Sequence, residues 1–490
     1  MDLLPEDSYE FYKRSSIHGV KWTGAAEFFT RIFQFGVTIV LARLLTPEDF
    51  GLIALSLVVV YFIQLVIDFG ISSAIIQKPD ITPLHYNSSF LIVPFFSLLI
   101  SVLFFYQSQV IANLLGNPNT SQLIKYLALL VILNGINFLP RVYLTRQLEF
   151  KKIAIAELLS IIAYGIFTIV FAFILRNVWC FVIGLVSEHL ILGFFLWFFS
   201  RLKIRLEIHW ASVKDLFNFS SVVFGTRLLN FFNINMLMIL INKFFGSISL
   251  GLFSLAYQII DLPTQRVAKN IMKVMYPILS KLQKNAADYE KILLNSLLII
   301  TLIILPFFTL LFILAKPFVL IFYGEKWIEA VPFIKILCIV GIIRSLWTGI
   351  SVVSMSLGRP AFELFLNVIF GAVFFPSIYI LNDYGLIPIL ISFSSILIFV
   401  FLFGYLKIFK WLGIPWNKIY QQFSKTLFSN LLVFILIYLL SNFFPFDISQ
   451  SIWLKFLLIG TIGMGLYLAI LYLLDKRYLQ NMFKQFVKSR

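Results

Sequence analysis

The sequence predicts an all-α integral membrane protein, and three observations lead to this fold class. The chain has 490 residues, of which 60% are hydrophobic and only 13% are charged, and its mean hydropathy is +0.95. Such a chain carries more apolar surface than one soluble interior can bury. Its apolar runs mostly exceed the roughly 20 residues that cross a membrane, and they recur from one end to the other. We expect about fourteen spans with no soluble domain between them.

The expected helices are defined by where each apolar run begins. They start near Gly19, Phe50, Ser88, Ser121, Ile153, Trp179, Val213, Ile248, Ile292, Glu329, Ala361, Leu386, Leu427 and Ile452. An even number of spans puts both termini on one side. The loops of that side hold roughly four times as many Lys and Arg residues as the opposite loops. The positive-inside rule therefore predicts cytoplasmic termini, and the net charge of +16 reflects basic loops beside an anionic leaflet rather than nucleic-acid binding.

The stretch LARLLTPEDFGL, at residues 41–52, reads locally as the start of the second helix. Thr46 suits the N-cap and Pro47 the first helical position. Glu48 and Asp49 then favour the positive end of the helix dipole. The motif lies on the outer side, between the first two spans.

An internal repeat divides the chain. Residues 41–55 align with residues 241–255, which pairs Gly51 with Gly251, and FFTR at 28–31 aligns with FGTR at 224–227. The predicted parts are a cytoplasmic segment 1–18, an N-lobe 19–205, a C-lobe 206–410, two added helices in 411–476 and a basic tail 477–490. The six-helix lobes would be related by an axis along the membrane normal, with a substrate site between them. The alternative is a duplication with no functional site between the two halves.

Ionisable residues within spans are costly in a membrane and are candidate functional groups. The first helix has one continuous polar face, formed by Lys21, Gly24, Glu27, Arg31, Gln34 and Thr38. Glu27 could instead pair with Arg31 across one helical turn. Asp68 and Asp261 lie near cytoplasmic helix ends, where interfacial snorkelling is the alternative.

Three arginines are predicted nearer the middle of the membrane: Arg31, Arg227 and Arg344. A guanidinium in a low-dielectric cavity suits a phosphate or diphosphate, which it binds through paired charge-assisted hydrogen bonds. We therefore predict an anionic cargo, held by these arginines with Gln34 and Asn230. Glu27, Asp68 and Asp261 are weaker candidates for ion coupling or charge balance.

Catalytic patterns are scarce, so we expect a protein that is not an enzyme and uses no cofactor. The four histidines are scattered, and the two cysteines, Cys180 and Cys338, form neither a disulfide framework nor a metal site. No nucleotide-binding loop is present, so ion gradients, the membrane potential or the cargo's own gradient would drive transport. Short outer loops leave little room for a glycosyltransferase or polymerase site.

Residues 15–77 resemble the polysaccharide transporter family, the Wzx-type flippases of the multidrug/oligosaccharidyl-lipid/polysaccharide exporter superfamily. The resemblance is carried by ARLL at 42–45, PEDFG at 47–51 and DFG at 68–70, and it is nearest to the branch that includes colanic-acid-type exporters. Thr30 and Arg31 also match a Ser-Arg pair of the related lipid II flippases. The second arginine of those proteins is Val37 here, which disfavours lipid II as the cargo.

The resemblance implies a flippase of the bacterial cytoplasmic (inner) membrane with a cationic cavity between two lobes. Its cargo would be undecaprenyl-diphosphate-linked oligosaccharide repeat units for cell-surface polysaccharide or lipopolysaccharide biosynthesis. Expected partners are this lipid-linked oligosaccharide, membrane lipid, and polysaccharide polymerase and assembly proteins. The alternatives are a multidrug-type cation antiporter, which conflicts with the arginines in the spans, and a membrane glycosyltransferase or polymerase.

Overall fold

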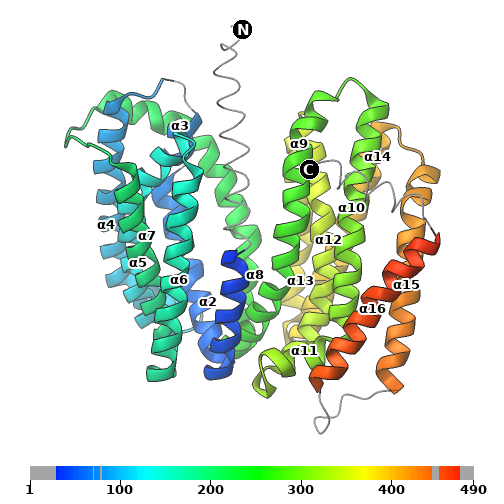
Figure 1. Ribbon diagram of the computed structural model, residues 1–490. Coiled ribbons are helices and arrows are strands. Elements are labelled where there is room, and N and C mark those ends of the chain that lie inside the picture. The colour runs from blue at the N-terminus through cyan, green and yellow to red at the C-terminus, as the bar shows by residue number, and fades with distance from the viewer. Residues whose placement is uncertain (1–28, 70, 78–79, 444–451, 475–490) are drawn as a thin grey trace. The chain divides into compact units, whose positions relative to one another are not determined.

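The computed structural model describes residues 29–69, 71–77, 80–443 and 452–474 (Figure 1). Within these ranges the regular structure is helical, which confirms the predicted fold class. Twelve helices of the described ranges are long and apolar enough to cross a membrane. The count of about fourteen is not confirmed. The expected first helix begins in residues outside the described ranges, and the span found in the region of the expected seventh and eighth helices begins only at Asn235.

Contacts divide the chain into two compact units, Met1–Gly251 and Leu252–Arg490. The lobe boundary at 205/206 stays a prediction. In the first unit residues 29–44 are helical. The labelled helices that follow are α2 (Pro47–Asp68), α3 (Ile71–Gln77), α4 (Pro83–Leu114), α5 (Thr120–Arg146), α6 (Phe150–Leu175), α7 (Trp179–Ser200) and the larger part of α8 (Trp210–Pro263). Helix α5 is central, since it packs along α2, α4 and α7, and α6 packs along α7.

The second unit begins with the end of α8. It continues through the π-helical turn η1 (Thr264–Ala268), α9 (Lys269–Lys281), α10 (Ala286–Ile313), α11 (Ala315–Phe322), α12 (Ala330–Ser356), α13 (Pro360–Leu381), α14 (Leu386–Leu412), α15 (Trp416–Phe443) and α16 (Ile452–Leu474). Helix α12 packs against α10 and α14, and α10 also packs against α15. Leu310, Ile437 and Tyr467 belong to a buried cluster that joins α10, α15 and α16.

The start of α2 confirms the local prediction made from the sequence. Thr46 is the N-cap, and its Oγ1 accepts a hydrogen bond from the Asp49 backbone N–H at 3.3 Å. The Asp49 carboxylate in turn accepts from the Thr46 N–H at 3.0 Å and from its hydroxyl at 2.7 Å. This reciprocal arrangement is a capping box with Pro47 at the first helical position.

Helix α8 consists of two helices that meet at Gly246. The φ of Gly246 is 79° and its ψ is 176°, a conformation that glycine adopts without the strain of a Cβ. The sequence places a helix start near Ile248, which agrees with this break. Just before it, Asn242 donates to the Leu115 carbonyl at 3.0 Å and accepts from the Asn117 amide at 3.4 Å. These bonds tie the end of the first α8 segment to the turn between α4 and α5.

Helix α15 begins at Trp416, not near Leu427 as the apolar run suggests. The polar residues before the run are part of the helix because they pair with α10. The Lys418 ammonium lies 2.8 Å from Glu290, and the Gln422 amide donates to Asn295 at 3.0 Å. Within the run itself, Asn430 donates to Thr309 of α10 at 2.8 Å. Interhelical hydrogen bonds of this kind let polar residues sit within a membrane bundle.

Candidate functional site

The first unit contains a cavity of about 300 Å³ lined by helices α2, α3, α4, α5 and α7. Its polar wall consists of Gln64, Asp68, Ser72, Asn134, Asn137, Arg141 and Thr145, and the rest of the wall is apolar. Such a combination of an apolar pocket with a few convergent polar groups is typical of small-molecule sites.

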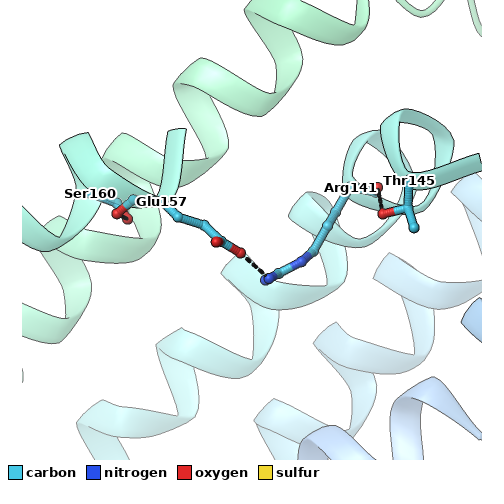
Figure 2. A network of polar contacts seen from close by, with 4 residues as sticks. All are labelled: Arg141, Thr145, Glu157 and Ser160. Carbon is cyan, nitrogen blue, oxygen red and sulfur yellow. Dashed lines mark hydrogen bonds and ion pairs between the residues drawn. The ribbon is translucent and has the colours of Figure 1, made fainter. Parts of the chain in front are cut away.

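Arg141 reaches the cavity from α5 and forms an ion pair with Glu157 of α6 (Figure 2). The two side chains are 51% and 39% exposed. Each residue's backbone carbonyl also accepts a bond from a neighbouring hydroxyl, Thr145 to Arg141 at 2.8 Å and Ser160 to Glu157 at 2.9 Å. Arg141 comes at the end of the fourth apolar run, where the positive-inside rule assigns it to a basic cytoplasmic loop. It lies inside α5, and its charge is compensated by Glu157.

Asp68 lines the same cavity at the joint between α2 and α3. Helix α2 ends there because the next residue, Phe69, is in the left-handed region with φ 39°. The Asp68 carboxylate accepts from the Ser72 backbone N–H at 3.1 Å and from its hydroxyl at 2.9 Å, so it caps the start of α3. Arg146 donates to the Ile75 carbonyl of α3 and fixes that short helix from the other side.

Arg31 and Gln34 lie on the helix formed by residues 29–44, and neither lines this cavity. Arg31 is exposed and donates to the Gln34 side-chain oxygen at 3.1 Å. The predicted partner Glu27 lies outside the described residues. Arg227 and Asn230 fall within α8, but their side chains are likewise outside the described set.

Arg344 occupies the middle of α12 in the second unit. It donates to the Tyr257 hydroxyl, and its guanidinium carbon lies 5.2 Å from the centre of the same ring, a cation–π contact. Asp261 follows Tyr257 by one turn of α8 and is partly buried. Beside Arg344, Ser345 and Thr264 share a hydrogen bond of 3.0 Å at the π-helical turn η1. Such turns are frequent at functional positions.

Sequence reasoning missed two acidic residues of the first unit, Glu157 and Glu188. Glu188 is partly buried on α7. The next residue, His189, bonds to the Leu185 carbonyl at 2.8 Å, and its own carbonyl accepts from Asn137 at 2.9 Å. A search for every carboxylate inside an apolar run would have found both acids.

The fold is that of known membrane transporters. The structure is similar to the lipid II flippase MurJ in an inward closed conformation, with a TM-score of 0.77 at 17% identity over 93% of this chain and 99% of that chain. It is also similar to an inward-facing multidrug resistance MATE transporter of the MOP superfamily, with a TM-score of 0.62 at 16% identity over 78% of this chain and 95% of that chain. The chain is therefore a multi-pass membrane protein with the fold of MOP-superfamily transporters.

Sequence comparison places the chain within that class. The model of the family described as "Polysaccharide biosynthesis protein" matches residues 40–332, and the chain belongs to this family. The chain is 28% identical to the lipopolysaccharide biosynthesis protein WzxC of Escherichia coli over 75% of each chain. It is 27% identical to the teichuronic acid biosynthesis protein TuaB of Bacillus subtilis over 70% of this chain and 71% of that protein. The family expected from the sequence resemblance is confirmed.

A third relative carries transport in its name. The chain is 26% identical to the succinoglycan biosynthesis transport protein ExoT of Rhizobium meliloti over 65% of each chain.

Proposed function

We propose that the chain is a flippase that carries undecaprenyl-diphosphate-linked oligosaccharide repeat units across the cytoplasmic membrane. The observation that carries this proposal is the family match over residues 40–332 in a chain with a transporter fold. The units would be moved from the cytoplasmic to the outer leaflet by alternating access, with both termini in the cytoplasm. Polysaccharide polymerase and assembly proteins would receive the product outside.

The diphosphate head group would be held by Arg31, Arg227 and Arg344, with Gln34 and Asn230 as hydrogen-bonding neighbours. Arg344 supports this role best. Among the described residues it forms no ion pair with a carboxylate, and its bound partner is the neutral Tyr257. A guanidinium in this state keeps its charge for an anionic ligand. Glu27, Asp68 and Asp261 would couple an ion or balance these charges.

A reconstituted flipping assay tests the proposal. Proteoliposomes would carry a labelled lipid-diphosphate oligosaccharide, and its appearance in the opposite leaflet would be followed for the wild type and for Arg31→Ala, Arg227→Ala and Arg344→Ala. Losing a charge-assisted hydrogen bond should slow flipping roughly tenfold or more. Arg205→Ala, which removes an exposed loop arginine, is the matched control and should flip at the wild-type rate.

Two results would contradict the proposal. If the wild type moves a cationic dye in exchange for protons but not the lipid-linked oligosaccharide, the multidrug-type antiporter is the better assignment. If the wild type flips the substrate and all three arginine variants do so at the same rate, the flippase stands and the assignment of the head-group site is wrong.

A further inference from the structure

The cavity of the first unit differs chemically from the surroundings of Arg344. Its basic residue, Arg141, is neutralised by Glu157, and Asp68 adds a carboxylate that bonds to Ser72. The cavity therefore has no surplus of positive charge. A diphosphate would meet a carboxylate at its wall and an arginine that is already paired, so an anion is a poor ligand for it.

Amide groups dominate the hydrogen-bonding capacity that remains. Among the described residues, the Gln64 side chain has no hydrogen-bond partner, and Asn134 uses its amide N–H only on the Leu130 carbonyl at 2.8 Å. The Asn134 carbonyl oxygen is left for another donor. Polar groups in a membrane span are costly without a partner. Both side chains line the cavity, where a hydroxyl-rich ligand would give each of them donors and acceptors together.

The rest of the wall suits the C–H surface of a ring. Phe138, Val142 and Leu196 form apolar wall beside these polar groups. A volume of about 300 Å³ lies at the small end of the range for ligand sites. A hexose ring, with twelve non-hydrogen atoms, fits a space of this size and presents both hydroxyl groups and C–H faces.

We infer that this cavity is a sugar-binding subsite, in which Gln64 and Asn134 bind the hydroxyl groups of one neutral sugar ring of the cargo. This inference rests on the proposed function for the identity of the cargo. It separates recognition into two places in the chain. The arginines bind the charged head group, and the cavity of the first unit binds the sugar. A sugar without hydroxyl groups in the right positions could not form these hydrogen bonds and would bind more weakly. Arg141 and Glu157 act as a fixed neutral pair at the edge of this subsite.

The experiment measures binding of free sugars, so it does not depend on flipping. The purified full-length chain in lipid nanodiscs would be mixed with glucose, galactose or N-acetylglucosamine, and saturation-transfer NMR would record contact with each sugar. We expect at least one sugar to give a signal that falls severalfold in Gln64→Leu and in Asn134→Leu. Gln109→Leu is the matched control, because Gln109 is an exposed amide on α4 outside the cavity, and it should keep the wild-type signal.

Two further arms sharpen the test. Gln64→Met keeps the length of the side chain and Asn134→Ala adds no bulk, so they provide folded variants without the amide group if the leucine substitutions reduce stability; their signals should fall as well. Inorganic pyrophosphate should leave the sugar signal unchanged. The inference is overturned if none of the three sugars gives a signal, if the signal survives in all four variants, or if pyrophosphate displaces the sugar. Sugar binding without flipping would instead disprove the flippase and leave the sugar site in place.

Discussion

Gly51 of α2 and Gly251 of α8 lie against each other, and neither position has room for a side chain. A Cβ on Gly51 would overlap the Ser247 carbonyl and approach the Gly251 nitrogen to 3.1 Å. A Cβ on Gly251 would overlap the Pro47 carbonyl and approach the Gly51 nitrogen to 3.1 Å. The contact is thus reciprocal, and its two residues are the pair that the internal repeat aligns. Small residues of this kind let membrane helices approach backbone to backbone.

We predict that Gly51→Ala and Gly251→Ala each destabilise the protein by about 1–3 kcal/mol, because the added carbon has a backbone atom as its neighbour. Thermal unfolding in detergent would show this as a lower Tm. Gly36→Ala is the control, since nothing lies within 4 Å of its Cβ position and alanine favours a helix. Its Tm should be unchanged or higher. Equal Tm values for all three variants would show that the close approach is not a constraint.

The capping box at the start of α2 predicts a coupled loss of stability. Thr46→Ala should cost about 0.5–2 kcal/mol, because an N-cap oxygen is lost. Asp49→Ala should cost a similar amount, since it leaves the Thr46 N–H without its acceptor. The double variant should cost less than the sum, because the two side chains bond to each other. Chemical unfolding of the four proteins measures the coupling, and simple additivity would argue against a shared box.

The function of Arg344 in flipping should depend on both the ring and the hydroxyl group of Tyr257. Tyr257→Phe removes the hydroxyl that accepts from Arg344 but keeps the ring under the guanidinium, so flipping should fall only a few-fold. Tyr257→Ala removes both contacts and should slow flipping more. Arg344→Lys should also be slow, because an ammonium cannot bind a diphosphate through two parallel bonds. The reverse order of the two Tyr257 variants would show that the ring does not hold the arginine.

The hydrogen bond between Asn430 of α15 and Thr309 of α10 should stabilise the second unit. Thr309→Val leaves the buried Asn430 without its acceptor, and its side-chain oxygen already lacks a partner among the described residues. The expected cost is about 1–2 kcal/mol, with a coupling energy of about 0.6 and up to about 1.7 kcal/mol in a double-mutant cycle with Asn430→Ala. Thr461→Val, on an exposed face of α16, should cost little. A coupling energy of zero would show that this hydrogen bond does not stabilise the helix bundle.

Glu157 should decide whether the first-unit cavity rejects anions. Glu157→Gln leaves the Arg141 charge without its carboxylate at the cavity wall, so pyrophosphate should now compete with the bound sugar. Glu149→Gln is the matched control, because it breaks the exposed Glu149–Lys152 pair away from the cavity. Competition titrations by saturation-transfer NMR measure the effect. If pyrophosphate competes equally in the control, the neutral pair is not what excludes it.

Much of the fold could be predicted because each membrane span is a long apolar run, which can be recognised from the local sequence alone. The helix start at Thr46 and the break at Gly246 could be predicted for the same reason, since caps and positive φ angles depend on neighbouring residues. The start of α15 could not. Its polar first turns look like a loop until Glu290 and Asn295 of α10 are known to face them.

The candidate site was harder to predict for a physical reason. Isolated charged residues such as Glu157 and Glu188 form no spacing pattern in the sequence. The role of each depends on which residues of other helices lie beside it. Arg141 lies near the end of α5, so its charge is read as part of a basic loop until the pairing with Glu157 is seen. Sequence reasoning did select Arg31, Arg227 and Arg344. No acidic residue lies within one turn of Arg227 or Arg344, and Glu27 lies one turn before Arg31.

The bonds of Asn242 bear on how this protein could be divided into fragments. Asn242 and Gly251 follow residue 205 in the chain but contact Leu115, Asn117 and Gly51, all of the first unit. A fragment that stops at residue 205 would expose these partners and lose their hydrogen bonds. Two co-expressed fragments divided after Gly251 keep the contacts within one polypeptide, so they are the better starting point for reassembling a working protein from separate halves.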